Sequence, residues 1–194
     1  MSTSRLEAFA DGVFAIAATL LILNVSVAGT PLGSQLLRIW PSYIAYLVPF
    51  VTIGIIWANH HLVMEQVGRV NRTFLMLNVL FLMMIAFIPF PTRLLAEHIR
   101  DEGARAAALA YGTTLTITAI LFNLTWRYAA SGRRLLREDA DARTVRGIGR
   151  TYLPGPFLYL GATLVALLSP PASAALYAAI AIFYVLESSI FGGG

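Results

Sequence analysis

The segment Arg5-Leu-Glu-Ala-Phe-Ala-Asp-Gly-Val-Phe-Ala-Ile-Ala-Ala-Thr-Leu-Leu-Ile-Leu-Asn-Val25 is the one around which the rest of the chain is organised. Its first turns are charged, and small or apolar residues then run from Gly12 to Leu23 with a single hydroxyl at Thr19. The apolar run is long enough to enter the hydrocarbon of a bilayer. A carboxylate such as Asp11 is costly beside lipid unless it has a partner. The segment therefore predicts a membrane helix with one side against protein or water.

The composition places the whole chain in a membrane. Of 194 residues, 58% are hydrophobic and only 12% are charged, about half the charged fraction of soluble domains. The mean hydropathy is +0.72. The absence of cysteine excludes disulfides and thiol chemistry. The pI of about 9.8 does not indicate nucleic-acid binding, because basic residues of membrane proteins gather in cytoplasmic loops.

Six apolar runs of membrane-spanning length follow one another along the chain. They predict an all-α integral membrane protein with six transmembrane helices per subunit and a single domain over residues 1–194. Glycine and proline mark the turn at 29–33, and the polar stretch from Ser131 to Arg150 is expected to be the main loop. The expected spans are 6–28, 39–61, 73–95, 106–128, 152–168 and 172–191.

The distribution of arginine predicts the orientation. All 14 basic residues are arginine. If the N-terminus is inside, ten lie on the inner side and four, Arg38, Arg93, Arg100 and Arg105, lie on the outer side. We therefore expect a multi-pass protein of the cell inner (plasma) membrane with both termini in the cytoplasm.

The charges of the first helix predict a polar network between helices. Arg5 and Asp11 lie on different faces of a helix, and Glu7 repels Asp11 at i,i+4, so Asp11 needs a partner from another helix. Candidates at the same membrane depth are Trp57, Asn59, His60, His61, Arg72 and Asn78. The alternative is that these charges are solvated at the membrane surface, with Trp57 an interfacial aromatic residue.

Ile16, Thr19, Leu20 and Leu23 share one face of the first helix. Such a face lines a pore or simply packs against a neighbour, and spacing alone does not separate the two. Thr19 has an equally plain interpretation, because threonine in membrane helices often donates to a backbone carbonyl, here that of Ala15.

Histidine and carboxylate placement favours neither a metal site nor an enzyme. His61 and Glu65 have usable i,i+4 spacing, but a catalytic zinc ion normally needs three protein ligands. The remaining candidate, His98, is expected on the other side of the membrane. We therefore expect no enzyme activity and no cofactor.

The first helix resembles a family signature. Arg5-Leu-Glu-Ala-Phe9-Ala-Asp11 is similar to the motif Arg-x-x-x-Phe-Ser-Asp of the bacterial relatives of the lysosomal potassium channel called transmembrane protein 175, with Ala10 in place of serine. The resemblance covers the whole chain. It continues in Trp57-Ala-Asn59-His60-His61, Asn78, Pro89-Phe90-Pro91-Thr92 and Tyr111-Gly112.

This resemblance implies a homotetrameric, potassium-permeable cation channel without a re-entrant pore loop. First helices line the pore of such channels. The narrow hydrophobic gate maps onto Ile16, further apolar rings map onto Leu20 and Leu23, and potassium preference maps onto Thr19. Arg5, Phe9 and Asp11 are expected to anchor the helix.

The partners expected are the bilayer, other copies of the chain and monovalent cations, with no nucleic acid and only permeating potassium in place of a cofactor. A secondary transporter or proton pathway using Asp11 and His61 is the alternative. It is less favoured because no internal repeat is evident. A non-conducting scaffold subunit is a third class.

Overall fold

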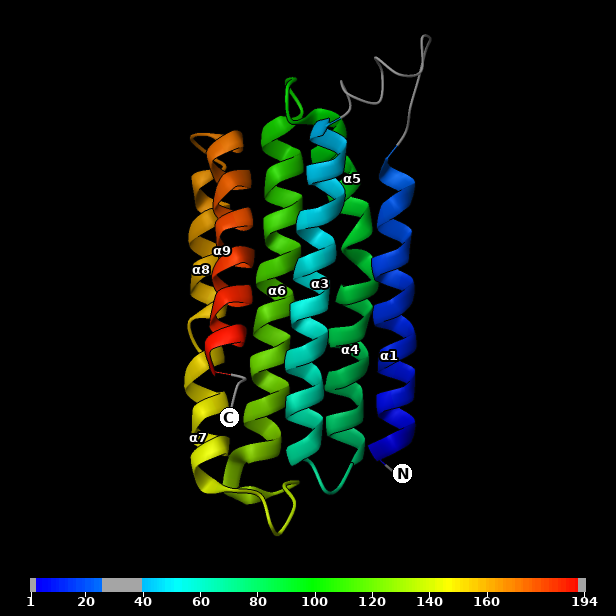
Figure 1. Ribbon diagram of the computed structural model, residues 1–194, viewed down its shortest axis with the longest axis vertical. Helices are drawn as coiled ribbons and strands as arrows, with labels where there is room; N and C mark the ends of the chain where they lie inside the picture. Colours follow the sequence, from blue (N-terminus) through cyan, green and yellow to red (C-terminus); the bar gives the residue numbers. More distant parts are fainter. Residues whose placement is uncertain (1–2, 26–39, 192–194) are drawn as a thin grey trace.

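The computed structural model describes residues 3–25 and 40–191, and these form an elongated bundle of roughly parallel helices (Figure 1). The predicted all-α fold is confirmed: within those ranges the one β-type contact is an isolated bridge between Val67 and Leu136. The predicted turn at 29–33 and Arg38 lie outside the described residues. The helices are α1 (Thr3–Leu20), η1 (Leu21–Asn24), α3 (Trp40–Gln66), α4 (Arg72–Phe87), α5 (Pro89–His98), α6 (Ala104–Ala130), η2 (Ser131–Arg133), α7 (Ala142–Tyr152), α8 (Gly155–Val165) and α9 (Pro170–Phe191).

Four helical segments are long and apolar enough to cross a bilayer: Thr3–Asn24, Ser42–Gln66, Arg72–His98 and Ala104–Arg133. The stacked pair α7–α8 and the helix α9, whose segment Pro170–Leu186 is also apolar, supply two further columns beside α6 (Figure 1). The protein is therefore a multi-pass membrane protein. Between 40 and 191 the columns of helices are joined by turns at the ends of the bundle, and no re-entrant loop enters it (Figure 1).

The third predicted span is a helix interrupted by proline. α4 ends at Phe87 and α5 begins at Pro89, with Ile88 still in helical conformation (φ −50°, ψ −42°). Pro89 and Pro91 lack the N–H groups that would continue the helical ladder. The column nevertheless resumes at once, because the amide of Thr92 donates to the carbonyl of Ile88 at 3.2 Å.

The fifth column differs from the sequence prediction. Residues 142–150, expected to belong to the loop, lie in α7, which ends at Tyr152 where the fifth span was expected to begin. The column breaks at Leu153–Pro154 before α8. α7 begins at Ala142 because the carboxylate of Asp141 caps it, accepting from the amide of Thr144 at 2.8 Å. The helix was not predicted because α7 has a polar face, and the prediction relied only on the length of apolar runs.

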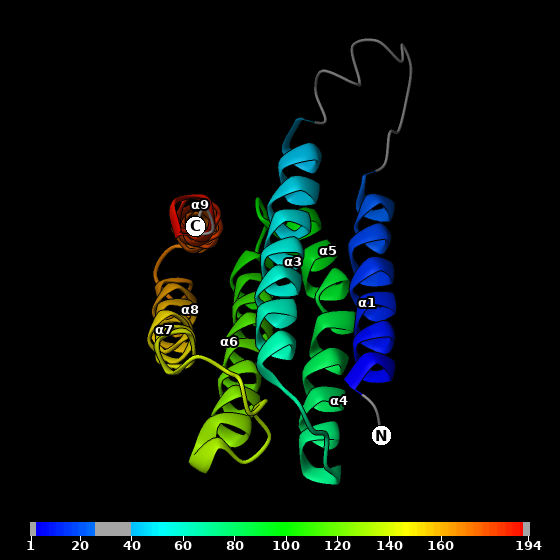
Figure 2. The same ribbon diagram turned by 60° about the horizontal axis from the view of Figure 1, so that its bottom comes forward.

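The helix α6 occupies the middle of the bundle, and α1 lies at its edge (Figures 1 and 2). One stripe along α1 and the start of η1 is buried: Leu6, Ala10, Phe14, Ala17 and Leu21. This stripe packs toward α3 and α4, the principal neighbours of α1. Val13 and Ala18 flank this stripe and are partly buried, and most of the remaining α1 surface is exposed.

The contact between α6, α8 and α9 is unusually close because of Gly112. The Tyr177 hydroxyl donates to Thr163 Oγ1 at 3.2 Å and lies 3.4 Å from the carbonyl oxygen of Ala108. Thr163 Oγ1 in turn donates to the carbonyl of Tyr159. A Cβ atom at Gly112 would overlap both the Tyr177 and the Thr163 oxygens. Glycine at this position therefore makes room for a buried group of hydroxyls between three helices.

Replacing Gly112 by alanine should destabilise the fold. The added methyl has to displace two buried oxygens, and overpacking of this kind costs about 1–3 kcal/mol. We expect a lower melting temperature of the purified protein in detergent than for the wild type. Gly161→Ala on α8 is the matched control, since a Cβ there has no atom within 4 Å. Equal melting temperatures for wild type and Gly112→Ala would contradict the packing described.

Candidate functional site

The side of α1 opposite its buried stripe is exposed in the single subunit. Ile16 is 62% exposed and Leu23 is 71% exposed. Leu20 and Thr19 are exposed on the same side. The four residues singled out from the sequence thus lie together on a continuous and largely apolar surface at the edge of the bundle. Only one oxygen-bearing side chain, that of Thr19, interrupts this surface between Ile16 and Leu23.

Thr19 bonds to its own helix, but not to the carbonyl that spacing suggested. Its hydroxyl donates to the carbonyl of Ile16 at 2.9 Å, one residue nearer than Ala15 would be. A hydroxyl has one hydrogen to donate and two lone pairs that accept. Donation to the backbone therefore leaves the oxygen of Thr19 able to act as a ligand.

Asp11 has a partner on the neighbouring helix. The indole Nε1 of Trp57 on α3 donates to Asp11 Oδ1 at 2.8 Å. The Trp57 ring stacks on His61, with 6.4 Å between ring centroids, and His61 Nε2 lies 3.5 Å from Glu65 Oε1. One hydrogen bond thus ties the first turns of α1 to α3, and a polar chain continues from it along the surface of α3.

His60 and Asn78 form a second, buried pair between α3 and α4. His60 Nε2 lies 3.0 Å from Asn78 Oδ1, and Asn78 Nδ2 donates to the carbonyl of Phe74 at 2.9 Å. Because the amide nitrogen of Asn78 is already a donor to the backbone, its oxygen accepts, and His60 carries hydrogen on Nε2. Phe14 and Phe81 pack against the His60 ring.

Two predicted members of the network stay apart from it in the single subunit. Arg5 and Phe9 are exposed on α1. The hydrogen bonds and ion pairs found among residues 3–25 and 40–186 do not join Arg5 to Asp11. Their anchoring role remains a prediction.

Sequence reasoning missed the part of the polar system that lies toward α6 and α7. The hydroxyl of Tyr152 donates to Asn59 Oδ1 at 2.9 Å, and Asn123 Nδ2 donates to the carbonyl of Tyr152 at 2.9 Å. Asn59 was a candidate, but its partner lies 93 positions away in the chain. The one sequence feature that could have indicated this contact is Tyr152, a tyrosine at the end of the amphipathic segment 142–152.

No metal centre is found in the described part of the chain. It contains no group of three or more His, Cys, Asp or Glu side chains that could hold an ion. His98 pairs with Asp101 at 2.9 Å in the turn that follows α5. That turn is at the end of the bundle opposite the beginning of α1.

Comparison with known proteins matches this arrangement to one family. The family model described as endosomal/lysosomal potassium channel TMEM175 matches residues 5–89. A protein of Chamaesiphon minutus named as a potassium channel is 42% identical over 193 residues, which cover 96% of this chain and 95% of that protein. The chain belongs to the TMEM175 family. A potassium channel of Streptomyces collinus is 39% identical over 191 residues, covering 94% of this chain and 91% of that protein.

The fold is also that of a solved TMEM175 structure. The crystal structure of a lysosomal potassium-selective channel TMEM175 homolog from Chamaesiphon minutus superimposes with a TM-score of 0.86 at 40% identity. The superposition covers 96% of this chain and 97% of that one.

Ala10 stands where the first-helix motif quoted above has serine, and it is fully buried among apolar side chains. A methyl group there needs no hydrogen-bond partner.

Proposed function

We propose that this TMEM175 protein is a potassium-permeable cation channel whose pore is formed by α1 from four copies of the chain. In this proposal residues 1–194 are one channel subunit, with the bilayer and identical subunits as its partners. The single observation that carries it is the exposed stripe of Ile16, Leu20 and Leu23 on a helix at the edge of the bundle. The names of the two bacterial relatives support potassium as the ion.

A single α1 presents one face and cannot enclose a pathway. A cyclic assembly brings the same face of each copy to a common axis. The number four comes from the family resemblance, and it gives rings of four identical side chains. The apolar stripe then lines the axis, while the buried stripe keeps each α1 attached to its own α3 and α4.

Ile16 is assigned the gate in this assembly. A ring of apolar side chains narrower than a hydrated ion is a barrier, both by its size and because water leaves an apolar constriction. Leu20 and Leu23 form further apolar rings beyond it. The channel therefore needs no cofactor and no catalytic residue, and the ions it carries are transient.

The proposed orientation follows the arginines. The end of the bundle where α1 begins also carries the α3–α4 turn and the loop 131–141, and α9 runs toward this end (Figure 1). That end holds Arg69, Arg72 and most other arginines of the chain. We place it in the cytoplasm, with the protein in the inner membrane.

Ion flux from purified protein in liposomes tests the proposal. Vesicles loaded with potassium should show protein-dependent efflux along the gradient. The efflux is recorded as the fluorescence change of a dye, and a potassium ionophore gives the signal for complete efflux. Native mass measurement of the same preparation should give a tetramer. Uptake that requires a proton gradient would instead favour a transporter using Asp11 and His61. Absence of flux from an intact tetramer would favour a scaffold subunit.

Thr19→Val should reduce discrimination between potassium and sodium. Valine keeps the shape of threonine but removes the oxygen, and four such oxygens beside the Ile16 ring favour the cation that loses water more easily. We expect a variant that assembles and conducts, with a reversal potential closer to zero under opposed potassium and sodium gradients. Thr19→Ser, which keeps the oxygen, is the control. An unchanged reversal potential in Thr19→Val would leave Thr19 with only its bond to the Ile16 carbonyl.

A further inference from the structure

The helix α7 has a face of arginines that the described part of the chain leaves exposed. Arg143, Arg146 and Arg150 recur at i, i+3 and i+7 and are exposed. The opposite face is fixed to the bundle: Ile148 and Tyr152 are buried, and Val145 packs against the same core. Its direction is therefore set by packing, and the three guanidinium groups form one basic stripe.

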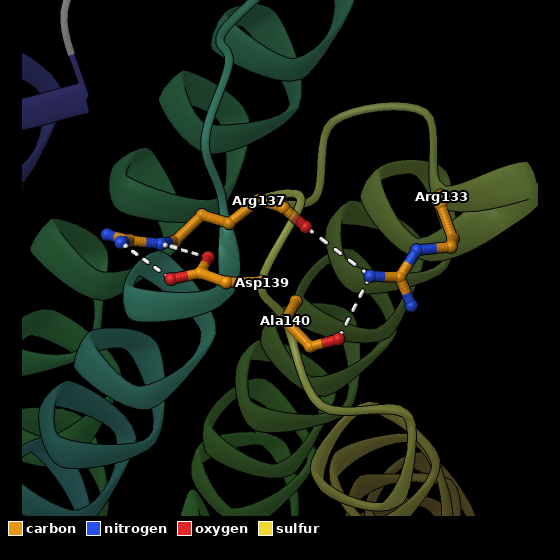
Figure 3. A network of polar contacts seen from close by, with 4 residues as sticks. All are labelled: Arg133, Arg137, Asp139 and Ala140. Carbon is orange, nitrogen blue, oxygen red and sulfur yellow. Dashed lines mark hydrogen bonds and ion pairs between the residues drawn. The ribbon is translucent and has the colours of Figure 1, made fainter.

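Two acidic side chains near α7, Asp139 and Asp141, are already engaged. Arg137 and Asp139 face each other in the preceding loop, with nitrogen–oxygen distances of 3.0 and 3.1 Å (Figure 3). This guanidinium holds the pKa of the Asp139 carboxyl below its ordinary value. Asp141 caps α7, and the hydrogen bond from the Thr144 amide lowers the pKa of the Asp141 carboxyl as well. Both carboxylates are thus ionised at neutral pH, but neither forms an ion pair with Arg146 or Arg150 within the described residues.

The loop arginines differ from those of α7 in having internal partners. Arg133 donates to the carbonyls of Arg137 and Ala140, at 3.4 and 2.9 Å (Figure 3). Arg134 lies over the Tyr128 ring, 5.0 Å from its centroid. These contacts hold the loop against the bundle. Arg143, Arg146 and Arg150 make no such side-chain hydrogen bond or ion pair within the described residues.

The position of α7 along the column sets its depth. α8 has 11 residues, which is about 16 Å at 1.5 Å per residue, whereas the hydrocarbon of a bilayer is about 30 Å thick. With the apolar residues on either side of α8, the apolar part of this column runs over 153–168, about 24 Å at the same rise. The remaining roughly 6 Å of hydrocarbon reaches the last turn of α7. Arg150 then lies at the boundary, and Arg146 and Arg143 lie on successive turns beyond it, where lipid phosphates are found. Long arginine side chains reach such phosphates while their stems stay on apolar surface.

We propose that the α7 stripe of Arg143, Arg146 and Arg150 binds the headgroups of anionic phospholipids. The surface is basic, faces outward from the bundle and lies at headgroup depth. Guanidinium groups match phosphate oxygens in charge and in hydrogen-bond geometry. The partner is thus the membrane's own anionic lipid, which covers a face that protein leaves open. This proposal does not depend on ion conduction.

Lipid retention measured by native mass spectrometry tests the proposal. The full-length protein is equilibrated in detergent micelles with equimolar phosphatidylglycerol and phosphatidylcholine, and bound lipids are counted. The wild type should retain phosphatidylglycerol preferentially. The triple variant Arg143→Gln, Arg146→Gln and Arg150→Gln should lose that preference. The affinity for phosphatidylglycerol relative to phosphatidylcholine should fall roughly fivefold for each arginine replaced.

Three controls make the outcome specific to α7. Replacing Arg93, Arg100 and Arg105 by glutamine removes the same charge from the other end of the bundle and should leave the preference unchanged. Replacing the three α7 arginines by lysine should keep most of it, which separates loss of charge from loss of fold. Glycerol phosphate, which carries the headgroup phosphate without acyl chains, should not displace the lipid at equal concentration.

Equal retention by the wild type and the α7 glutamine variant would overturn the proposal. An equal loss in the Arg93, Arg100 and Arg105 variant would also overturn it, because net charge would then explain the preference. So would a lysine variant as defective as the glutamine variant. Displacement by glycerol phosphate would identify a site for soluble phosphates and not a lipid surface.

Discussion

Ile16→Asn should raise the potassium flux of the reconstituted protein. In the proposed tetramer this change replaces four apolar side chains at the narrowest ring by four amides, which hold water in the constriction and lower the barrier to ions. A reduction of about 1.4 kcal/mol corresponds to a roughly tenfold faster flux, and we expect at least that. Ile16 is exposed in the subunit, so the substitution does not disturb the core.

The matched control for Ile16 is an exposed apolar residue on another helix. Leu160→Asn introduces the same amide on α8, away from the stripe proposed to line the pore, and Leu160 is exposed as well. It should leave the flux per assembled channel unchanged. Unchanged flux from a correctly assembled Ile16→Asn tetramer would move the constriction elsewhere, with Leu20 and Leu23 the next candidates.

Asp11→Ala should lower the yield of tetramer. The substitution removes the acceptor of the Trp57 indole and with it a side-chain hydrogen bond between α1 and α3. A hydrogen bond to a charged group contributes about 1.5–3 kcal/mol, and the lower end applies here because both side chains are exposed in the subunit. All four subunits lose the bond at once, so small losses accumulate in the assembly. Size-exclusion chromatography with native mass measurement gives the tetramer fraction.

Two further variants separate structure from permeation at this position. Asp11→Asn keeps an acceptor oxygen for the indole and should assemble better than Asp11→Ala. Trp57→Phe removes the donor and should reproduce the defect of Asp11→Ala. A normal Asp11→Ala tetramer with altered ion preference would place Asp11 on the conduction path, against the role assigned to it here.

The long apolar helices are the part of the fold that sequence predicts best. The expected spans 39–61, 73–95 and 106–128 correspond to α3, α4–α5 and α6, each of which runs further into its flanking polar residues. Hydropathy reports which residues favour hydrocarbon, and not where the backbone is helical. A span predicted from hydropathy therefore ends where polar residues begin, although the helix continues. Hydropathy missed α7 for the same reason, because the apolar side of this helix consists only of Val145, Ile148 and Tyr152, between arginines.

The polar contacts were less predictable than the helices. Asp11 called for a partner on another helix, and Trp57 was among the candidates, but spacing within one helix could not select it. The bond from Tyr152 to Asn59 and the close approach at Gly112 depend on residues far apart in the chain. A glycine in an apolar helix carries no sign that a tyrosine hydroxyl from α9 will lie against it.

Thiol modification tests most directly whether the exposed face of α1 lines the conduction path. The chain contains no cysteine, so Leu23→Cys gives a single reactive group on that face, and Leu164→Cys gives a matched group on the exposed side of α8. Potassium current is recorded in bilayers before and after a charged methanethiosulfonate reagent is added. The account predicts that the reagent blocks current through Leu23→Cys and leaves Leu164→Cys and wild type unchanged. Current through Leu23→Cys that persists after complete modification, confirmed by mass, would contradict it.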